Sequence, residues 1–121
     1  MKEYAACDIR NIAIVGHGQK GKTSLCEALL YCCGGIDRLG SVQNGTTVSD
    51  YDPEEIKRNC SVSTSLIPLE WENTKINILD TPGFFDFESE KISGLSAADC
   101  AVIVISGKTG VDVGSEKVWN Y

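Results

Sequence analysis

The sequence has few residues that bind transition metals and no segment that could cross a membrane. It contains one histidine, His17, and none of its six cysteines form a Cys-x-x-Cys pair, so a zinc site is not expected. No apolar run reaches the length of a membrane span, and the amino terminus has no signal-peptide pattern. We therefore expect a cytoplasmic protein with no membrane partner.

Positive charge is also scarce. With 11 Lys and Arg against 17 Asp and Glu, the formal net charge is −6, and the resulting field repels nucleic acid and anionic membrane surfaces. We expect no direct, sequence-specific binding of nucleic acid by these 121 residues. The length suits one domain, and a hydrophobic content of 42% is enough for a core.

The cysteines are expected to be free thiols in a reducing compartment. Cys26 and Cys100 fall on apolar faces of predicted elements, which places both in the core. Cys32 and Cys33 are adjacent in sequence, so a disulfide between them would be strained.

The apolar runs predict four strands. Residues 11–15 and 101–105 are typical of strands buried in a parallel sheet, and 101–105 is the strongest of them. Residues 63–71 and 74–79 are two further strands, and the tight turn between them makes the pair antiparallel. Pro68 has no N–H to donate, so the first strand of this pair belongs at a sheet edge.

Three segments have helical spacing. Residues 23–33, 88–98 and 115–121 are predicted helices, and the second of them turns Ile92 and Leu95 inward. The order of strands and helices predicts an α/β fold, with a mostly parallel sheet, helices on both faces and one antiparallel edge strand.

The stretch 35–63 is polar and rich in turn residues, and it is too long for an idle connection. Within it, Asp52 to Glu55 predicts the start of a short helix, with Asp52 as the cap and Glu55 reaching back to it. An acidic partner-binding patch at 50–55 is the alternative that this pattern leaves open.

A glycine-rich loop lies between the first strand and the first helix. Gly16 to Thr23 matches the phosphate-loop pattern G-x-x-x-x-G-K-[ST]. Its backbone N–H groups and the start of the helix would surround a phosphate chain, Lys22 would add positive charge, and the Thr23 hydroxyl would ligate magnesium. The alternative is a glycine-rich turn with a solvated lysine. The expected nucleotide contacts of this loop are Gly16, His17, Gly18, Gln19, Lys20, Gly21, Lys22, Thr23 and Ser24.

A second motif follows the strand at 74–79. Asp80 would hold magnesium through a water, and the N–H of Gly83 would approach the γ-phosphate. The alternative is an ordinary turn at the end of a strand. The nucleotide contacts expected here are Asp80, Thr81, Pro82, Gly83 and Phe84.

These motifs point to a family. The chain resembles the amino-terminal part of the GTPase domain of elongation factor G in the runs "RNIAIVGHGQKGKTSLCEALLY", "DYDPEEIKRNCSVSTSLIPLEW", "KINILDTPGFFDF" and "SEKVWNY". The resemblance extends from Arg10 over nearly the whole chain and is nearest to the diverged, second-copy branch of bacterial elongation factor G-like proteins.

The resemblance implies a P-loop nucleotide hydrolase fold that binds GTP or GDP with Mg²⁺. It makes 35–63 switch I and Asp80 to Phe84 switch II, and it implies a multidomain GTPase that acts on the ribosome. Because the chain stops in a predicted helix after four strands, we expect residues 1–121 to be the amino-terminal part of a single GTP-binding domain, a truncated G domain with one side of its sheet unpaired. The family's base-reading motif would lie beyond residue 121.

Three positions depart from the family pattern. Ser61 stands where the family has a magnesium-ligating threonine and keeps the hydroxyl, and Gln19 stands in place of an aspartate. Phe84 stands where the family has the histidine that positions the attacking water, and it can neither donate nor accept a proton. We expect Lys20 to be a solvated surface lysine and His17 to have a structural role rather than replace that histidine.

Three functions remain open at this stage. The first is a translational GTPase with Lys22 as its catalytic residue, Phe84 in the catalytic position, slow intrinsic hydrolysis, and stimulation by the ribosome. The second is a GTP-gated switch that docks on the ribosome with little or no hydrolysis. The third is a P-loop ATPase or transferase unrelated to translation. For residues 1–121 alone we predict weak nucleotide affinity.

Overall fold

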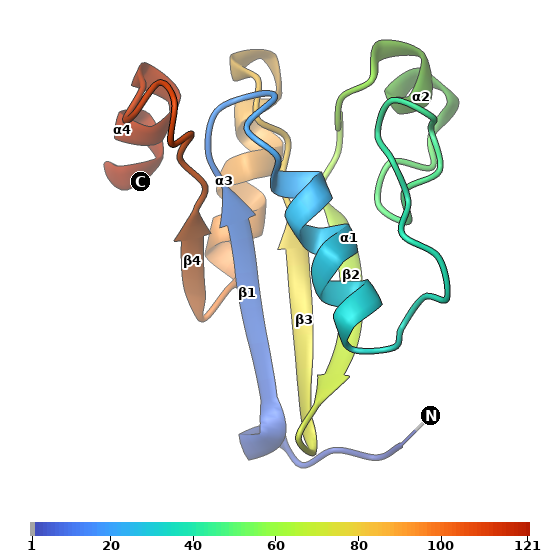
Figure 1. Cartoon of the computed structure of the whole chain (residues 1–121). Coiled ribbons are helices and arrows are strands. Elements are labelled where there is room, and N and C mark those ends of the chain that lie inside the picture. The colour runs from blue at the N-terminus through green and yellow to red at the C-terminus, as the bar shows by residue number, and fades with distance from the viewer. Residues whose placement is uncertain (1) are drawn as a thin grey trace.

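A twisted sheet with helices on both faces makes up the computed structural model, which describes residues 2–121 (Figure 1). The strands lie in the order β2-β3-β1-β4. β1 pairs in parallel with β3 and β4, whereas β2 is antiparallel to β3. The elements are β1 (Ile9–Val15), α1 (Lys22–Cys32), α2 (Pro53–Arg58), β2 (Ser65–Trp71), β3 (Thr74–Asp80), α3 (Glu88–Ala97), β4 (Cys100–Ile103), α4 (Val113–Trp119) and the 3-10 helices Ala6–Asp8 and Phe85–Phe87. The predicted fold class is confirmed.

The β2–β3 hairpin forms as its sequence predicts. Glu72 and Asn73 both have positive φ, 44° and 65°, which is the conformation of a two-residue turn that matches strand twist. Trp71 therefore lies opposite Thr74, and the ladder continues to Ser65 and Asp80. β2 is an edge strand, and Pro68 is tolerated there because its missing N–H breaks no ladder inside the sheet.

Two apolar layers cover the two faces of the sheet. Successive residues of β1 point to opposite faces, so Ile14 packs on one side and Ala13 and Val15 on the other. α1 covers the Ile14 side through Cys26 and Leu30, and α3 and α4 cover the other side (Figure 1). Cys26 is fully buried, as predicted.

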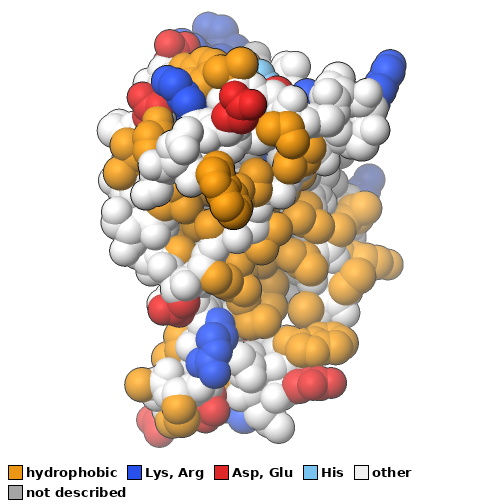
Figure 2. All heavy atoms as spheres, turned by 90° about the vertical axis from the view of Figure 1, so that its left-hand side faces the viewer, with side chains coloured by type: hydrophobic (Ala, Val, Ile, Leu, Met, Phe, Trp, Pro, Cys, Tyr) orange, Lys and Arg blue, Asp and Glu red, His pale blue; other side chains and the backbone are white. Residues whose placement is uncertain are grey.

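β4 is the element whose burial the sequence misjudged. The run 101–105 was expected to be the best-buried strand, and Cys100 to lie in the core, but Cys100 to Val102 are exposed. β4 is the edge strand next to β1, and in residues 2–121 no strand pairs with its outer side. Figure 2 shows apolar side chains gathered on this side of the molecule.

The inward face of α3 also differs from the prediction. Leu95 packs into the core, but Ile92 is exposed, whereas Lys91 and Gly94 are buried. Gly94 is in contact with Thr81, since a Cβ on the glycine would lie 2.8 Å from the Thr81 methyl carbon. This close approach of α3 to the end of β3 turns Lys91 inward. Within residues 2–121, no helix combines the length and the apolar character that a bilayer crossing requires.

Candidate functional site

The phosphate-loop pattern occupies the connection from the carboxyl end of β1 to α1. Gly16 has φ 140°, and a Cβ there would lie 2.6 Å from the carbonyl oxygen of Val104, so the close packing of the loop on the neighbouring strand requires glycine. Gly21, with φ 89°, is the residue before α1. The loop is therefore shaped by glycine at both ends, and it leads straight into a helix amino terminus.

Lys22 is the first residue of α1, and its side chain folds back over the loop. The Nζ donates to the carbonyl oxygen of His17 at 3.0 Å. The side chain is buried, and burial lowers the pKa of Lys22, an effect that the charge of Asp80 opposes. A buried ammonium needs a negative partner, and a phosphate group would supply one.

Two hydroxyls and two carboxylates meet beneath the loop. Thr23 Oγ1 donates to Asp80 Oδ2 at 2.8 Å, and Ser61 Oγ donates to Asp50 Oδ1 at 2.7 Å. The hydroxyl oxygens of Thr23 and Ser61 are 3.2 Å apart. Residues far apart in the sequence therefore converge, and Ser61, which the family resemblance predicts to be a magnesium ligand, lies beside Thr23.

This group of oxygens fits a hard cation. Each hydroxyl has one proton, and each proton is already donated to a carboxylate, so the lone pairs of Thr23 and Ser61 face each other. Asp80 Oδ1 and Asp50 Oδ2 are buried without a hydrogen-bond partner. Oxygen ligands of this kind are the ones that Mg²⁺ prefers, and a cation would satisfy all four oxygens.

The two carboxylates have perturbed acidities. Burial raises the pKa of Asp80 from 3.8 to about 6, while the hydrogen bond from Thr23 opposes the shift. Burial also raises the pKa of Asp50, and the Ser61 hydroxyl opposes it. Both shifts have the same origin, because burial removes the ionised oxygens from water and the positive charge of Lys22 offsets only part of that cost.

Asp50 is a site residue that the sequence did not predict, because in the sequence it is only the first residue of an acidic run. Within that run Asp50 and Glu55 are buried, whereas Asp52 and Glu54 are exposed. Asp52 and Glu55 form the predicted capping box at the start of α2, and Glu55 also accepts the N–H groups of Val62 and Ser63. The signal that could have identified Asp50 is its place eleven residues before Ser61 in the same switch segment.

The segment predicted to be switch II, Asp80 to Phe84, lies directly on the phosphate loop. A Cβ on Gly83 would collide with Lys22 Nζ and lie 2.6 Å from the Gly18 backbone, so only glycine allows this approach. A Cβ on Gly18 would be 2.9 Å from the ring of Phe84. The Phe84 ring thus lies against the loop, in the space that the missing Gly18 side chain leaves open.

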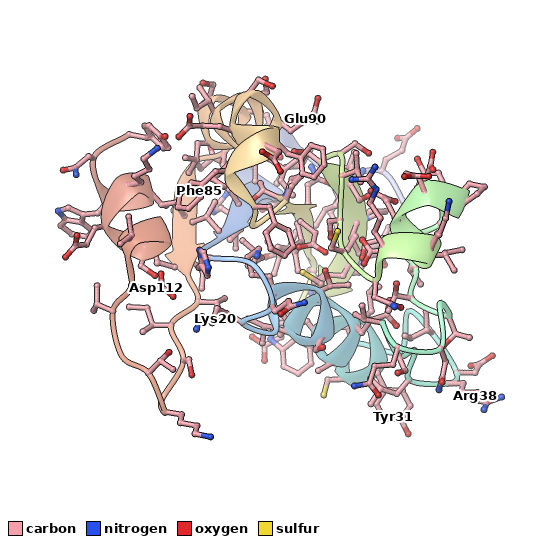
Figure 3. All side chains as sticks on the ribbon, turned by 90° about the horizontal axis from the view of Figure 1, so that it is seen from above. Lys20, Tyr31, Arg38, Phe85, Glu90 and Asp112 are labelled. Carbon is pink, nitrogen blue, oxygen red and sulfur yellow. The ribbon has the colours of Figure 1, made fainter. Side chains whose placement is uncertain are left out.

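Lys20 is not the solvated surface lysine that we expected. Its Nζ donates to Thr109 Oγ1 at 3.0 Å and lies 3.5 Å from Asp112 Oδ2. Figure 3 shows Lys20 and Asp112 on facing loops. Asp112 caps α4 by accepting the N–H of Ser115, so Lys20 ties the phosphate loop to the start of α4.

His17 faces away from the loop's open side. Its ring lies 5.7 Å from that of Phe85, at 55°, and a Cβ on Gly114 would come within 2.5 Å of Nδ1. Phe85 in turn has Lys117 Nζ 4.8 Å from its ring centroid. His17 therefore packs between switch II and α4.

A hollow of about 670 Å³ opens above these groups. Phosphate-loop residues from Gly18 to Ser24 line it, together with residues 39–43, Ser61 and Phe84. Of the predicted contacts, Gly16, His17, Asp80, Thr81 and Pro82 do not reach its wall. Thr81 instead donates to the Ile14 carbonyl at 2.8 Å, which joins the ends of β3 and β1.

These features define a P-loop nucleotide-binding protein. A glycine-shaped loop joins a strand to a helix, and a lysine, a threonine and a strand-end aspartate lie with it at one edge of a mostly parallel sheet. The chain belongs to the family described as elongation factor Tu GTP binding domain, whose sequence pattern matches residues 7–121. Membership in this family sets aside the P-loop ATPase or transferase considered from the sequence.

Curated relatives of the chain include an elongation factor G-like protein and a mitochondrial ribosome-releasing factor. It is 44% identical over 111 residues to an elongation factor G-like protein of Mycobacterium tuberculosis, in a match that covers 92% of this chain and 16% of that protein. It is 44% identical to a mitochondrial ribosome-releasing factor 2 of Scheffersomyces stipitis, over 91% of this chain and 13% of the relative. The chain therefore spans only about an eighth to a sixth of the length of these curated relatives.

A solved structure agrees with the fold in detail. A protein of Thermus thermophilus has a crystal structure that superposes with a TM-score of 0.91 at 43% identity, covering 95% of this chain and 17% of that one. The resemblance to elongation factor G-like proteins stated from the sequence is confirmed.

Proposed function

We propose that this chain binds GTP and GDP with Mg²⁺ and forms part of an elongation factor G-like GTPase that acts on the ribosome. Intrinsic hydrolysis is slow, and the ribosome stimulates it. The observation that carries the proposal is that Lys22, Thr23 and Ser61 meet at one hollow. Asp80 lies beneath it and accepts the Thr23 hydroxyl, so a buried ammonium and unsatisfied oxygens fit a phosphate and a metal.

Each group has a distinct task in this proposal. The backbone N–H groups of the loop and the Lys22 ammonium hold the phosphates and stabilise charge that develops during transfer. Thr23 and Ser61 would hold the magnesium ion through their hydroxyls, and Asp80, with Asp50 beside it, would hold it through water. When bound, the ion neutralises charge on the β- and γ-phosphate oxygens.

Phe84 decides how fast the reaction runs. Its ring has no atom that can orient a water or move a proton, and general acid–base and positioning groups typically contribute about 10²–10⁴-fold to a rate. Binding does not need that side chain. The chemical step therefore depends on the preorganised loop and on what the ribosome adds.

A second candidate function is a GTP-gated ribosome-binding switch with little or no hydrolysis. The packing of the Phe84 ring on Gly18 favours it, because the ring lies where a water-orienting side chain would be expected. Both candidates place the protein in the cytoplasm, with the ribosome contacted through the full-length protein and no sequence-specific nucleic-acid contact by these residues.

We also propose that residues 1–121 are the amino-terminal part of a single GTP-binding domain in a larger protein. Two observations support this: the chain spans only about an eighth to a sixth of the reported relatives, and β4 presents apolar side chains beside an unpaired edge. Guanine selectivity would then reside in residues outside the chain.

The experiment is phosphate release by the full-length protein with and without ribosomes, comparing wild type, Phe84→His and Phe84→Ala. The GTPase proposal expects wild-type turnover only with ribosomes, and a rise of about 10²-fold or more for Phe84→His but not for Phe84→Ala. Wild-type protein that binds GTP and ribosomes but releases no phosphate would contradict the GTPase function and support the GTP-gated switch. Brisk wild-type turnover without ribosomes would contradict the slow intrinsic step.

A further inference from the structure

Glu27 on α1 is a buried carboxylate without an assigned role. It is 1% exposed, and within residues 2–121 it forms no salt bridge with a lysine or arginine. Its two oxygens accept backbone N–H groups instead: Oε2 from Gly40 at 3.1 Å and Oε1 from Val48 at 2.5 Å. Burial of an ionised carboxylate is costly unless it is hydrogen-bonded, so these two bonds are what allow Glu27 to be there.

Both bonds go to switch I, at the two ends of one loop. Within that loop Thr46 closes the chain on Ser41, since the Thr46 N–H donates to the Ser41 carbonyl at 3.2 Å and Thr46 Oγ1 accepts from the Ser41 N–H at 3.0 Å. Residues 39–43 of the same loop line the hollow. Glu27 thus anchors the part of switch I that forms one wall of the site.

Gly40 shows how closely the two segments approach. A Cβ at this position would lie 2.6 Å from Glu27 Oε2 and 2.5 Å from the Thr46 carbonyl oxygen. Any side chain would have to push switch I away from α1. The contact therefore requires glycine on one side and a carboxylate on the other.

The anchor lies close to the magnesium ligands. Val48 is two residues before Asp50, which accepts from Ser61, and Ser61 touches Thr23 at 3.2 Å. Thr23 and Glu27 are one helical turn apart on α1. Helix α1 thus holds switch I at two points. Glu27 binds the N–H groups of Gly40 and Val48, and Thr23 contacts Ser61.

We propose that Glu27 is a positioning residue, which holds the 40–48 loop of switch I closed over the nucleotide site and so keeps Ser61 and Asp50 in place for the metal. Its effect on nucleotides rests on the proposed function, in which switch I is needed for the γ-phosphate and magnesium. Loss of Glu27 should then penalise GTP more than GDP, because GDP has no γ-phosphate for switch I to cover.

The first test needs no nucleotide. Hydrogen exchange is measured on the full-length protein, without nucleotide, for wild type, Glu27→Ala, Glu27→Gln and Gly40→Ala. Loss of hydrogen bonds to a charged acceptor should speed exchange of the 40–48 amides by roughly 10- to 100-fold, with the β1 and β3 amides unchanged. The matched control is Glu54→Gln, which removes a charge from the same switch segment but affects only an exposed pair with Arg58. Unchanged exchange at 40–48, or equal loss of protection across the sheet, would overturn the proposal.

The second test measures affinity for a non-hydrolysable GTP analogue and for GDP, both with Mg²⁺. Glu27→Ala and Gly40→Ala should weaken the GTP analogue roughly tenfold more than GDP, and Glu27→Gln should have an intermediate effect because its amide oxygen still accepts one N–H. Equal weakening of both nucleotides would show a structural role only and overturn the proposal. Full-length wild-type protein that binds neither nucleotide would refute the proposed function, while the exchange result would still decide the role of Glu27.

Discussion

The clearest quantitative consequence of the site concerns Asp80. Its carboxylate is 1% exposed, one oxygen has no partner, and burial raises its pKa from 3.8 to about 6. A difference of about two units corresponds to about 3 kcal/mol of unfolding free energy at full ionisation. In metal-free protein the ionised Asp80 is therefore a strong destabilising element.

The direction with pH follows from the sign of the shift. Because the pKa is raised on folding, the folded chain holds the Asp80 proton more tightly than the unfolded chain does. The stability associated with this proton is fully present below about pH 4 and is lost as the pH rises through about 6. At pH 7.5 the wild type bears the full cost.

The perturbation is Asp80→Asn. The amide is neutral and nearly the same size, and its oxygen still accepts the Thr23 hydroxyl. In EDTA at pH 7.5 we expect the variant to be more stable by up to about 3 kcal/mol, which is roughly 10 °C in the melting temperature of a chain this size. Below pH 4 the gain should vanish, because the wild-type carboxyl is then neutral too.

The assay is urea and thermal unfolding followed by circular dichroism at pH 4, 5, 6 and 7.5 in EDTA. Asp37→Asn, an exposed aspartate in switch I, is the control for general charge effects. Addition of Mg²⁺ with nucleotide should stabilise the wild type more than Asp80→Asn. A variant that is less stable than wild type at every pH, or a gain independent of pH, would refute the argument that the burial cost of the Asp80 carboxylate is only partly offset.

Two further predictions concern the contacts around switch II. Gly18→Ala places a Cβ 2.9 Å from the Phe84 ring, so it should destabilise the chain by about 1–3 kcal/mol. In a Phe84→Ala background this loss of stability should largely disappear. Additive effects of the two substitutions in urea unfolding would show that the residues do not touch. Lys91→Met should raise the melting temperature at pH 7. The 2% exposed Lys91 has a long, 3.5 Å bond to the Gly83 carbonyl and a Phe85 ring 6.0 Å away, and burial lowers its pKa. Since a lowered lysine pKa makes the wild type more stable as the pH rises, the gain should shrink toward pH 10, and a loss of stability at pH 7 would contradict the reasoning.

Much of the fold could be predicted because its signals are local. The capping box at Asp52 and Glu55 and the two-residue turn of the β2–β3 hairpin depend on residues a few positions apart. Pro68 at the sheet edge follows from one missing N–H. The phosphate loop also lies in one continuous segment, which is why its pattern could be recognised without any knowledge of its surroundings.

The wrong predictions of burial have a common reason. The composition of β4 is that of a core strand, but burial depends on what lies next to it, and its outer edge has no neighbouring strand in residues 2–121. Lys91 is buried and Ile92 exposed because Gly94 lets α3 approach Thr81, a contact that helical periodicity does not include. Lys20 was predicted to be solvated because its partner Asp112 is ninety-two residues away.

By itself the sequence determined the order of strands and helices, the shape of the phosphate loop and the absence at position 84 of any group that handles protons, because these depend on residue type and short-range spacing. Only the tertiary structure decided that Asp50, Ser61 and Asp80 meet at Thr23, that Glu27 holds switch I and that the Phe84 ring lies on Gly18. Those contacts join segments that come together only when the sheet and its helices pack, and the energetic cost of burying charge then selects which polar groups face each other.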